Sequence, residues 1–253
     1  MNQKKEEALL LKHLKDLSHI SYQRGYRTYS DFLNINEISL FLQYQKDIVT
    51  SQYRLWGGYD DAERRVICFY EDDSSNTMSF PIQCLLIQPA NKKFSDALNH
   101  RDYLGAILNL GIDRKKVGDI IVKDKEAYVF CQKDITPYII DNLNRIKHTT
   151  VLVTRQNEKI EAFEPNFIEI TGTVSSLRLD AILSVAFRTS RNSLTGLIEG
   201  QKVYVNNRLV ETNSFSLKEG DNVSVRGMGK FVFQGASEQT KKKRYKIIIS
   251  KYI

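Results

Sequence analysis

Residues 178–208, which read RLDAILSVAFRTSRNSLTGLIEGQKVYVNNR, decide the fold of the C-terminal part of this chain. The first ten residues predict a helix with one apolar face, formed by Leu179, Ile182, Leu183, Ala186 and Phe187. Thr189 and Ser190 then supply a cap for a second helix over residues 191–199, which Gly200 ends. We therefore expect two short helices in close succession.

A tight hairpin follows these helices. Asn206 and Asn207 lie between the strand-like segments KVYV and RLV, and asparagine tolerates the left-handed backbone that a two-residue hairpin turn requires. A second turn at 219–221 precedes the alternating strand NVSVR, in which Val223 and Val225 face the same side. The helices are thus expected to bury their apolar faces on a short sheet.

The positive charge of the chain is concentrated in the same region. The net formal charge is +7, and residues 178–253 hold 14 Lys or Arg and 6 Asp or Glu, a net of +8. The remaining 177 residues are close to neutral, at −1. This distribution indicates a module that binds a polyanion, most often nucleic acid, with a solubilising tail as the alternative. A membrane-surface helix is disfavoured because the basic run 241–244 leads into a strand-like segment.

The predicted module suits phosphate binding. Arg191 and the unpaired N–H groups of the second helix begin at the same point, so a phosphate would meet both. Residues 226–230, RGMGK, are expected to form a flexible loop with basic ends. Any single arginine is as often a solvated surface residue as a residue that contacts a ligand. The predicted RNA-binding residues are Arg178, Arg188, Ser190, Arg191, Lys202, Arg208, Arg226, Lys230, Lys241, Lys242, Lys243 and Arg244.

The first 160 residues are expected to form two further domains. Residues 1–80 predict an N-terminal α/β domain, with a helical pattern over 9–17, a helix capped by Asn36, and a buried strand at 65–70. Residues 81–160 predict the order βαββαβ, a ferredoxin-like arrangement that RNA-recognition-motif domains share, with a Thr136-Pro137 helix start. Tyr128 and Phe130 on a strand could stack bases, but core packing is favoured. A charged linker is expected over 155–172.

Composition favours a soluble cytoplasmic protein. Apolar residues make up 42% of the chain and Pro and Gly are few, so ordinary packed cores are expected rather than disorder. The longest apolar runs are far shorter than the roughly 20 residues of a membrane helix. The three cysteines, Cys68, Cys84 and Cys131, lack metal-ligand spacing and indicate a reducing compartment.

The motif residues of the C-terminal segment resemble the ribosomal-protein S-four type of RNA-binding domain. These residues are Arg178-Leu179-Asp180, Ser190-Arg191, Gly200 and the segment 203–206. The chain departs from the family pattern at one place: four residues separate Gly200 from Val205-Asn206, where the family has two. GGYDDAERRV at 57–66, the block at 100–122 and SVRGMGKF at 224–231 are similar to blocks of the YlmH family. This resemblance implies an RNA-recognition-like middle domain and a C-terminal S-four domain. It also implies binding to the large ribosomal subunit with peptidyl-tRNA, in quality control of stalled translation and C-terminal tailing of the nascent chain.

No set of catalytic residues is evident. Asp180 lies in a triplet similar to that of pseudouridine synthases, but too little chain follows it for a synthase domain, and a helix-start charge paired with arginine is favoured. His100-Arg101-Asp102 matches the start of the kinase catalytic loop, but the other kinase motifs are missing, so the match is attributed to chance or to structure. The loop 57–63 is read as a turn with solvated acids rather than as a metal or partner site. We expect no cofactor and no metal.

The sequence therefore predicts an α+β protein with domains at 1–80, 81–160 and 175–253. Its expected function is non-enzymatic binding of rRNA and tRNA on the large ribosomal subunit. We expect a cytoplasmic monomer that interacts with quality-control proteins and does not bind a membrane. The alternatives are a cell-division-linked adaptor with a nonspecific RNA anchor and an RNA-modifying enzyme.

Overall fold

The computed structural model describes residues 2–71, 79–156, 167–239 and 243–252. The chain divides into two compact units, residues 1–37 with 44–161 and residues 38–43 with 162–253. The three domain boundaries expected from the sequence stay a prediction.

The N-terminal part of the first unit is a small antiparallel sheet with helices. Its elements are α1 (Asn2–Arg24), β1 (Thr28–Tyr29), α2 (Ile35–Ile48), β2 (Gln52–Trp56) and β3 (Val66–Tyr70), with strand order β1-β3-β2. Both helices and the strand at 65–70 were predicted. The predicted cap of α2 was wrong: Asn34, not Asn36, accepts from the Glu37 backbone, and the Glu37 carboxylate accepts from the Asn34 N–H in return.

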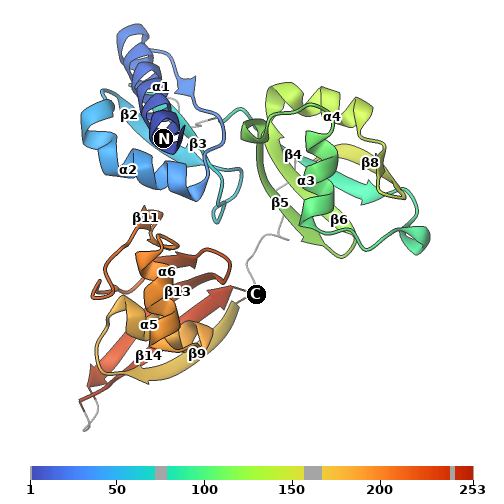
Figure 1. Cartoon of the computed structure of the whole chain (residues 1–253). Helices are drawn as coiled ribbons and strands as arrows, with labels where there is room; N and C mark the ends of the chain where they lie inside the picture. Colours follow the sequence, from blue (N-terminus) through green and yellow to red (C-terminus); the bar gives the residue numbers. More distant parts are fainter. Residues whose placement is uncertain (1, 72–78, 157–166, 240–242, 253) are drawn as a thin grey trace. The chain divides into compact units, whose positions relative to one another are not determined.

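The middle part of the first unit has the predicted βαββαβ order. Its elements are β4 (Ile82–Pro89), α3 (His100–Leu108), β5 (Val117–Lys123), β6 (Glu126–Gln132), α4 (Thr136–Asn142), β7 (Arg145–Ile146) and β8 (Thr149–Gln156). Three short 3-10 turns, Lys92–Phe94, Arg114–Lys116 and Lys133–Ile135, lie between them. The antiparallel sheet has the order β5-β6-β4-β8-β7, and α3 and α4 cover one of its faces (Figure 1). Thr136 is not the cap of α4, because it is already helical and its hydroxyl donates to the Lys133 carbonyl.

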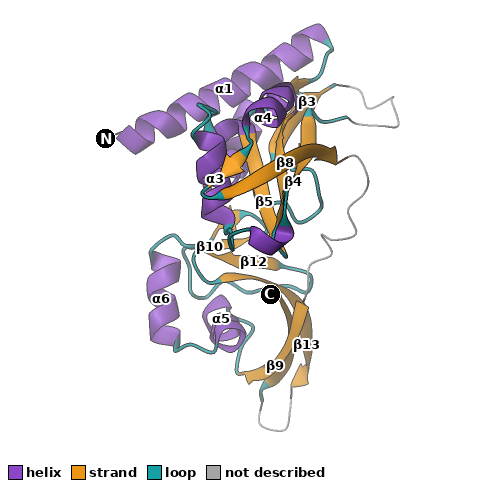
Figure 2. Ribbon diagram, turned by 90° about the vertical axis from the view of Figure 1, so that its right-hand side faces the viewer, coloured by secondary structure: helices purple, strands orange, loops and turns teal. Residues whose placement is uncertain are grey.

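The second unit is a six-stranded antiparallel sheet with two helices on one side (Figure 2). Its elements are β9 (Phe167–Val174), α5 (Leu179–Phe187), α6 (Arg191–Glu199), β10 (Val203–Val205), β11 (Arg208–Leu209), β12 (Asn222–Val225), β13 (Gly229–Gln239) and β14 (Tyr245–Tyr252). The strand order is β11-β10-β12-β13-β14-β9. Its core joins the helix residues Leu179, Ile182 and Leu194 to sheet residues such as Phe231 and Ile249.

Two expectations for this unit were wrong. The linker expected over 155–172 overlaps β9, which pairs along its whole length with β14; residues 157–166 lie outside the described chain. The loop expected at 226–230 is a tight hairpin, in which Val225 pairs with Gly229 and the Met228 N–H donates to the Val225 carbonyl. Gly227 and Gly229 allow it because both have positive φ, at 83° and 103°.

Candidate nucleic-acid interface

The Arg178-Leu179-Asp180 triplet forms a closed start for α5. The N–H groups of Leu179 and Asp180 donate to the carbonyls of Phe215 and Asn213, at 2.7 and 3.4 Å. The Arg178 Nε donates to the Asp180 Oδ1 at 3.1 Å, and Asp180 is only 9% exposed. The pairing expected for Asp180 is therefore confirmed, and the charge of Arg178 is shared with that carboxylate.

The start of α6 is more open. Arg188 ends α5 with a left-handed backbone (φ 50°), and Ser190 caps α6 by accepting from the Ser193 N–H at 3.4 Å. The first turn of α6 carries no acidic residue, so the positive end of the helix dipole meets no carboxylate within its own turn. Arg188 and Ser190 are exposed. Arg191 is the first residue of α6, as predicted, and its side chain lies outside the described structure.

The two hairpins bring Lys202 and Arg226 together. Asn206 and Asn207 adopt φ of 50° and 62°, which confirms the predicted two-residue turn between β10 and β11. The Arg226 N–H donates to the Lys202 carbonyl at 2.8 Å, so these exposed residues are neighbours although 24 positions separate them in sequence. Arg208 is exposed on the edge strand β11.

Aromatic contacts place the end of α5 over the same end of the sheet. The Phe187 ring lies 5.9 Å from that of Phe231, and the Lys251 Nζ lies 4.6 Å from the Phe187 ring centroid. Lys230, next to Phe231, holds its Nζ 4.4 Å from the centroid of Tyr252. One end of the sheet thus gathers a set that we call the basic end: Arg188, Ser190, Lys202, Arg226 and Lys230.

The other predicted basic residues lie elsewhere. Lys230 lies near the start of β13, and Lys243 lies just before β14, whose first residue Tyr245 pairs with Gln239 at the other end of β13. Nine residue steps of strand, about 30 Å, separate those two ends of β13. The Arg244 Nη2 donates to the Thr173 carbonyl at 2.9 Å, at the end of the sheet where β9 leads on towards Arg178. Lys241 and Lys242 lie outside the described residues. The sequence cluster is therefore split, because β13 and β14 carry its last members away from the helices.

Sequence reasoning missed the residues that line the basic end from β14. Lys251 and Tyr252 pair with Phe231 and Phe167 in neighbouring strands, and the Tyr252 ring contacts the Phe167 ring with centroids 4.7 Å apart. Only the long β13–β14 register brings them beside Lys230. Strand β13 is hard to recognise in the sequence, because its register with β14 shifts around Gly235 and the alternation of apolar residues is interrupted there.

The sheet of the middle part is partly covered by the chain itself. Phe130 is 3% exposed and stacks on Tyr59 at 5.1 Å, which fits the predicted core role of Phe130. Asp119 accepts from the Tyr59 hydroxyl at 2.9 Å and from the Glu63 N–H at 2.7 Å. Burial, followed by the charge of Asp119, raises the pKa of Tyr59, which therefore stays a hydrogen-bond donor. The loop 57–63 is thus a turn with exposed acids, Asp60 and Glu63, as expected, and it also packs Tyr59 on the sheet, which was not expected.

Gly58 explains how this loop approaches the sheet. Its φ is +107°, and a Cβ there would lie 2.3 Å from the Phe130 ring. Only glycine fits this position without displacing the ring or straining the backbone.

The described residues hold no group of three His, Cys, Asp or Glu side chains arranged for a metal. Among those residues, no helix is both long and apolar enough to span a membrane.

Comparisons with known proteins agree with this geometry. Residues 76–159 match the family described as "Putative RNA-binding domain in YlmH", and residues 177–223 match the S4 domain family. The second match ends within β12, so β13 and β14 lie beyond it. Two families of RNA-binding domains thus account for the middle part and for the helices with the first hairpin. They define an S4-domain RNA-binding protein with α+β architecture.

Relatives narrow the class further. The chain is 33% identical, over 197 residues, to the Ribosome-associated protein quality control protein P2 of Bacillus subtilis (strain 168), across 76% of this chain and 74% of that one. The chain belongs to the YlmH family. A solved structure titled cell division protein ylmH from Streptococcus pneumoniae is 22% identical, with a TM-score of 0.49, and covers 60% of this chain and 92% of that chain.

Proposed function

We propose that this protein is a non-enzymatic factor that binds rRNA and tRNA on the large ribosomal subunit. Its role is in quality control of stalled translation and tailing of the nascent chain. The supporting observation is the basic end of an S4 domain in a chain whose relative is named a ribosome-associated quality control protein. In this proposal it acts in the cytoplasm, as a monomer, with other quality-control proteins.

The basic end is the main RNA contact in this proposal. Arg188, Lys202 and Arg226 of this end neutralise phosphates together with Arg191, the first residue of α6, and the start of α6 adds backbone N–H donors. Lys230 is already held over Tyr252, so it positions that ring as well as adding charge. Arg208 extends the contact along the edge of the sheet. Arg178, Lys243 and Arg244 lie away from this end and would add a separate RNA contact, and Lys241 and Lys242, which lie outside the described residues, stay predicted RNA-binding residues.

Sucrose-gradient sedimentation of the protein with cell lysate, followed by sequencing of cross-linked RNA, tests the proposal. The expected result is protein in large-subunit fractions, with cross-links in large-subunit rRNA and in tRNA. Protein at the top of the gradient with scattered cross-links would overturn it and favour an adaptor with a nonspecific anchor. Turnover of an RNA substrate by the purified chain would overturn the non-enzymatic part.

A further inference from the structure

The sheet of the second unit carries a row of three side chains on the face turned away from α5 and α6 (Figure 2). They are Lys230 on β13, Tyr252 on β14 and Phe167 on β9, and Tyr252 pairs directly with Phe167 in the strand register. The neighbours Phe231 and Lys251 point the other way, one into the core and one onto an aromatic ring of α5. We call these three side chains the aromatic row.

Contacts within the aromatic row hold its side chains in place. The Lys230 Nζ lies 4.4 Å from the centroid of the Tyr252 ring. The Phe167 and Tyr252 rings meet with 4.7 Å between their centroids and an interplanar angle of 63°. The Tyr252 hydroxyl accepts from the Asn222 Nδ2 at 3.4 Å. Tyr252 therefore contacts a cation, an amide and a second ring, and it is the support against which Phe167 is held.

Phe167 is the open ring of the aromatic row. It is 46% exposed, and Ile248, which lies further along the same face on β14, is 39% exposed. Val232 on β13 adds a third apolar side chain to this face, opposite Ser250. The outward face of an antiparallel sheet usually carries polar residues, and exposed apolar groups with a polar rim mark binding surfaces. The aromatic row therefore offers an open ring to a ligand.

The charges beside this ring indicate the ligand. Lys230 belongs to the basic end, so a phosphate bound there lies one tyrosine away from Phe167. Glu169, the next residue of β9 on the same face, is exposed and disfavours a phosphate on the Phe167 side, but its carboxylate can accept from the amino group of a base. A cation for the backbone beside a ring for a base is the combination that binds unpaired nucleotides.

We propose that the aromatic row binds an unpaired nucleotide of an RNA, with its base stacked on Phe167 and its phosphate on Lys230. Inside a duplex both faces of a base are already stacked on its neighbours, so the open ring selects a single strand. Because Lys230 is shared with the basic end, the preferred RNA is a duplex that continues into a single strand. This inference rests on the proposed function, since it names the form of RNA that the basic end binds.

The three residues of the aromatic row lie outside the S4 match, which covers residues 177–223. They come from β9, which precedes the match, and from β13 and β14, which follow it. The proposed site is therefore an addition that the flanking strands make to the S4 domain. Its loss should change the preference between RNA forms and leave the phosphate contacts at the start of α6 in place.

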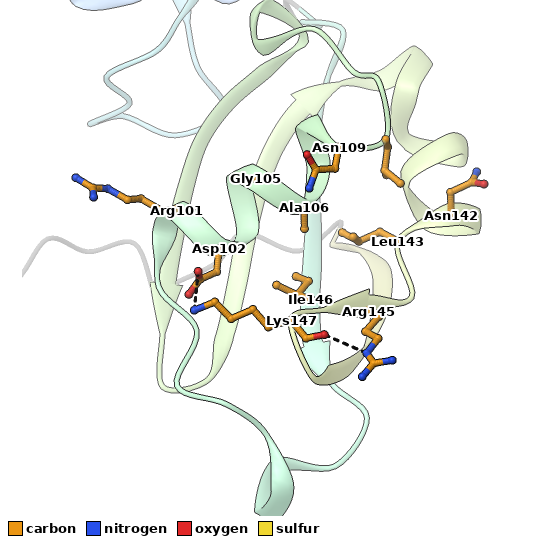
Figure 3. Close-up of a pocket in the computed structure, with 11 residues that line it drawn as sticks. Arg101, Asp102, Gly105, Ala106, Asn109, Asn142, Leu143, Arg145, Ile146 and Lys147 are labelled. Atoms are coloured by element: carbon orange, nitrogen blue, oxygen red, sulfur yellow. Dashed lines mark hydrogen bonds and ion pairs between the residues drawn. The ribbon is translucent and has the colours of Figure 1, made fainter.

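The cavity between α3 and α4 in the first unit lacks this combination (Figure 3). Arg101 and Arg145 point away from it on opposite sides, and Lys147 pairs with the Asp102 carboxylate at 2.8 Å. None of its described lining residues is aromatic. The test is therefore directed at the second unit.

The test compares two RNA hairpins that carry short single-stranded extensions at both ends, made of ordinary nucleotides in one RNA and of abasic nucleotides in the other. Both keep the same phosphates, so only stacking differs. Fluorescence anisotropy with the full chain should show about tenfold tighter binding of the ordinary RNA. Phe167→Leu keeps an apolar side chain and should lose this preference, and Phe167→Tyr should retain it.

A second measurement reports on the ring itself. Trp56 is the only tryptophan of the chain, so Phe167→Trp combined with Trp56→Phe places a single fluorophore in the aromatic row. The ordinary extension should quench its fluorescence by stacking, and the abasic extension should not. Tyr22→Ala, which removes an exposed ring from α1, is the matched control and should keep the tenfold preference.

Equal affinity of the native chain for the two RNAs, or binding of neither, would overturn the proposal. A preference that survives in Phe167→Leu would overturn it as well. If Phe167→Leu loses ribosome co-sedimentation while the native chain shows no preference, a protein partner covers the row and the proposal fails. The proposed function is tested separately: a native chain that stays at the top of the sucrose gradient but prefers the ordinary extension refutes the ribosomal role and leaves this site standing.

Discussion

The helices α3 and α6 begin in different ways, although each lies with a partner helix on one face of an antiparallel sheet. Asn99 caps α3, and Asp102 in its first turn accepts from the Asn99 N–H, so this start is closed by its own carboxylate. Ser190 caps α6 by accepting from the Ser193 N–H, and the two serine hydroxyls lie 3.0 Å apart in a second hydrogen bond, so no carboxylate takes part. The first helical residue is Arg191 in α6 and His100 in α3. The same architecture thus offers a neutralised helix start in one unit and a positive one in the other.

The difference shows that residues of the first turn, rather than the fold, decide which helix start is neutralised by a carboxylate. In the first unit the Asp102 carboxylate lies at the start of α3, while in the second no acidic residue lies in the first turn of α6 and Arg188 ends the preceding helix beside it. Changes in charge at the start of α6 should therefore affect RNA binding far more than equal changes on α1. The following predictions run from the largest expected effect to the smallest.

Arg191→Glu with Lys202→Glu should abolish co-sedimentation with ribosomes, because two phosphate contacts become repulsive, and weaken binding at least about tenfold. The fold should persist, since an acidic residue is favourable in the first turn of a helix. Circular dichroism measures whether the fold persists, and sedimentation measures whether the protein still binds ribosomes. Lys12→Glu with Lys15→Glu, exposed on α1, makes the same change of charge and should sediment normally. Normal sedimentation of the first pair would refute the interface.

Salt should weaken RNA binding steeply. If about five phosphates are neutralised, the log–log slope of affinity against salt is roughly −3.5 to −4.5, and a fourfold rise in salt costs roughly 100- to 500-fold in affinity. Arg226→Gln should make the slope shallower by about 0.7 to 0.9, and Lys243→Gln should change it little because Lys243 lies away from the basic end. Filter binding over a salt series gives the slopes, and equal changes for the two variants would contradict the division of the basic residues.

Ser193→Glu converts the open start of α6 into the closed type found in α3. The new carboxylate can accept from the Ser190 N–H, so stability should rise by about 0.5 to 1 kcal/mol while RNA affinity falls about three- to fivefold. Ser193→Gln, the neutral control, should stabilise the helix without the loss of affinity. Thermal melts and anisotropy measure the two quantities. A rise in stability with no loss of RNA affinity in Ser193→Glu would show that the helix start is not a phosphate contact.

Asp180→Asn should have the smallest effect on function. It weakens the bond to Arg178 and should lower stability by about 1 kcal/mol, with RNA affinity nearly unchanged. Chemical denaturation and pseudouridine mapping of bound RNA check this. The interpretation of Asp180 as a structural residue fails if the native chain forms pseudouridine and the Asn variant does not.

The sequence predicted those elements whose signals are local. Helix α6 with its Ser190 cap, the Asn206-Asn207 turn and the βαββαβ order all follow from short-range patterns that the structure keeps. Strands β9 and β13 were missed because their evidence lies in long-range pairing with β14, and β13 is interrupted by a bulge at Gly235. The basic residues were found by composition, but their division between two ends of the sheet depends on the length of β13.

The packing of Gly58 and Tyr59 on Phe130 likewise could not be read from a loop of glycines and acids. Its partner, Asp119, lies about 60 positions away on β5, and nothing near it in sequence indicates that it receives three donors, from Tyr59, Glu63 and the Arg64 N–H. Sequence spacing therefore predicted the local elements better than it predicted which surfaces the chain covers itself.

The measurement that tests the central claim most directly is mass spectrometry of peptides cross-linked to RNA in ribosome fractions that contain the native protein. The account predicts cross-linked nucleotides on peptides from residues 188–208 and 226–230, around the open start of α6 and the basic end. Cross-links confined to residues 82–156, with none on those peptides, would show that the S4 domain of this chain is not its main contact with RNA.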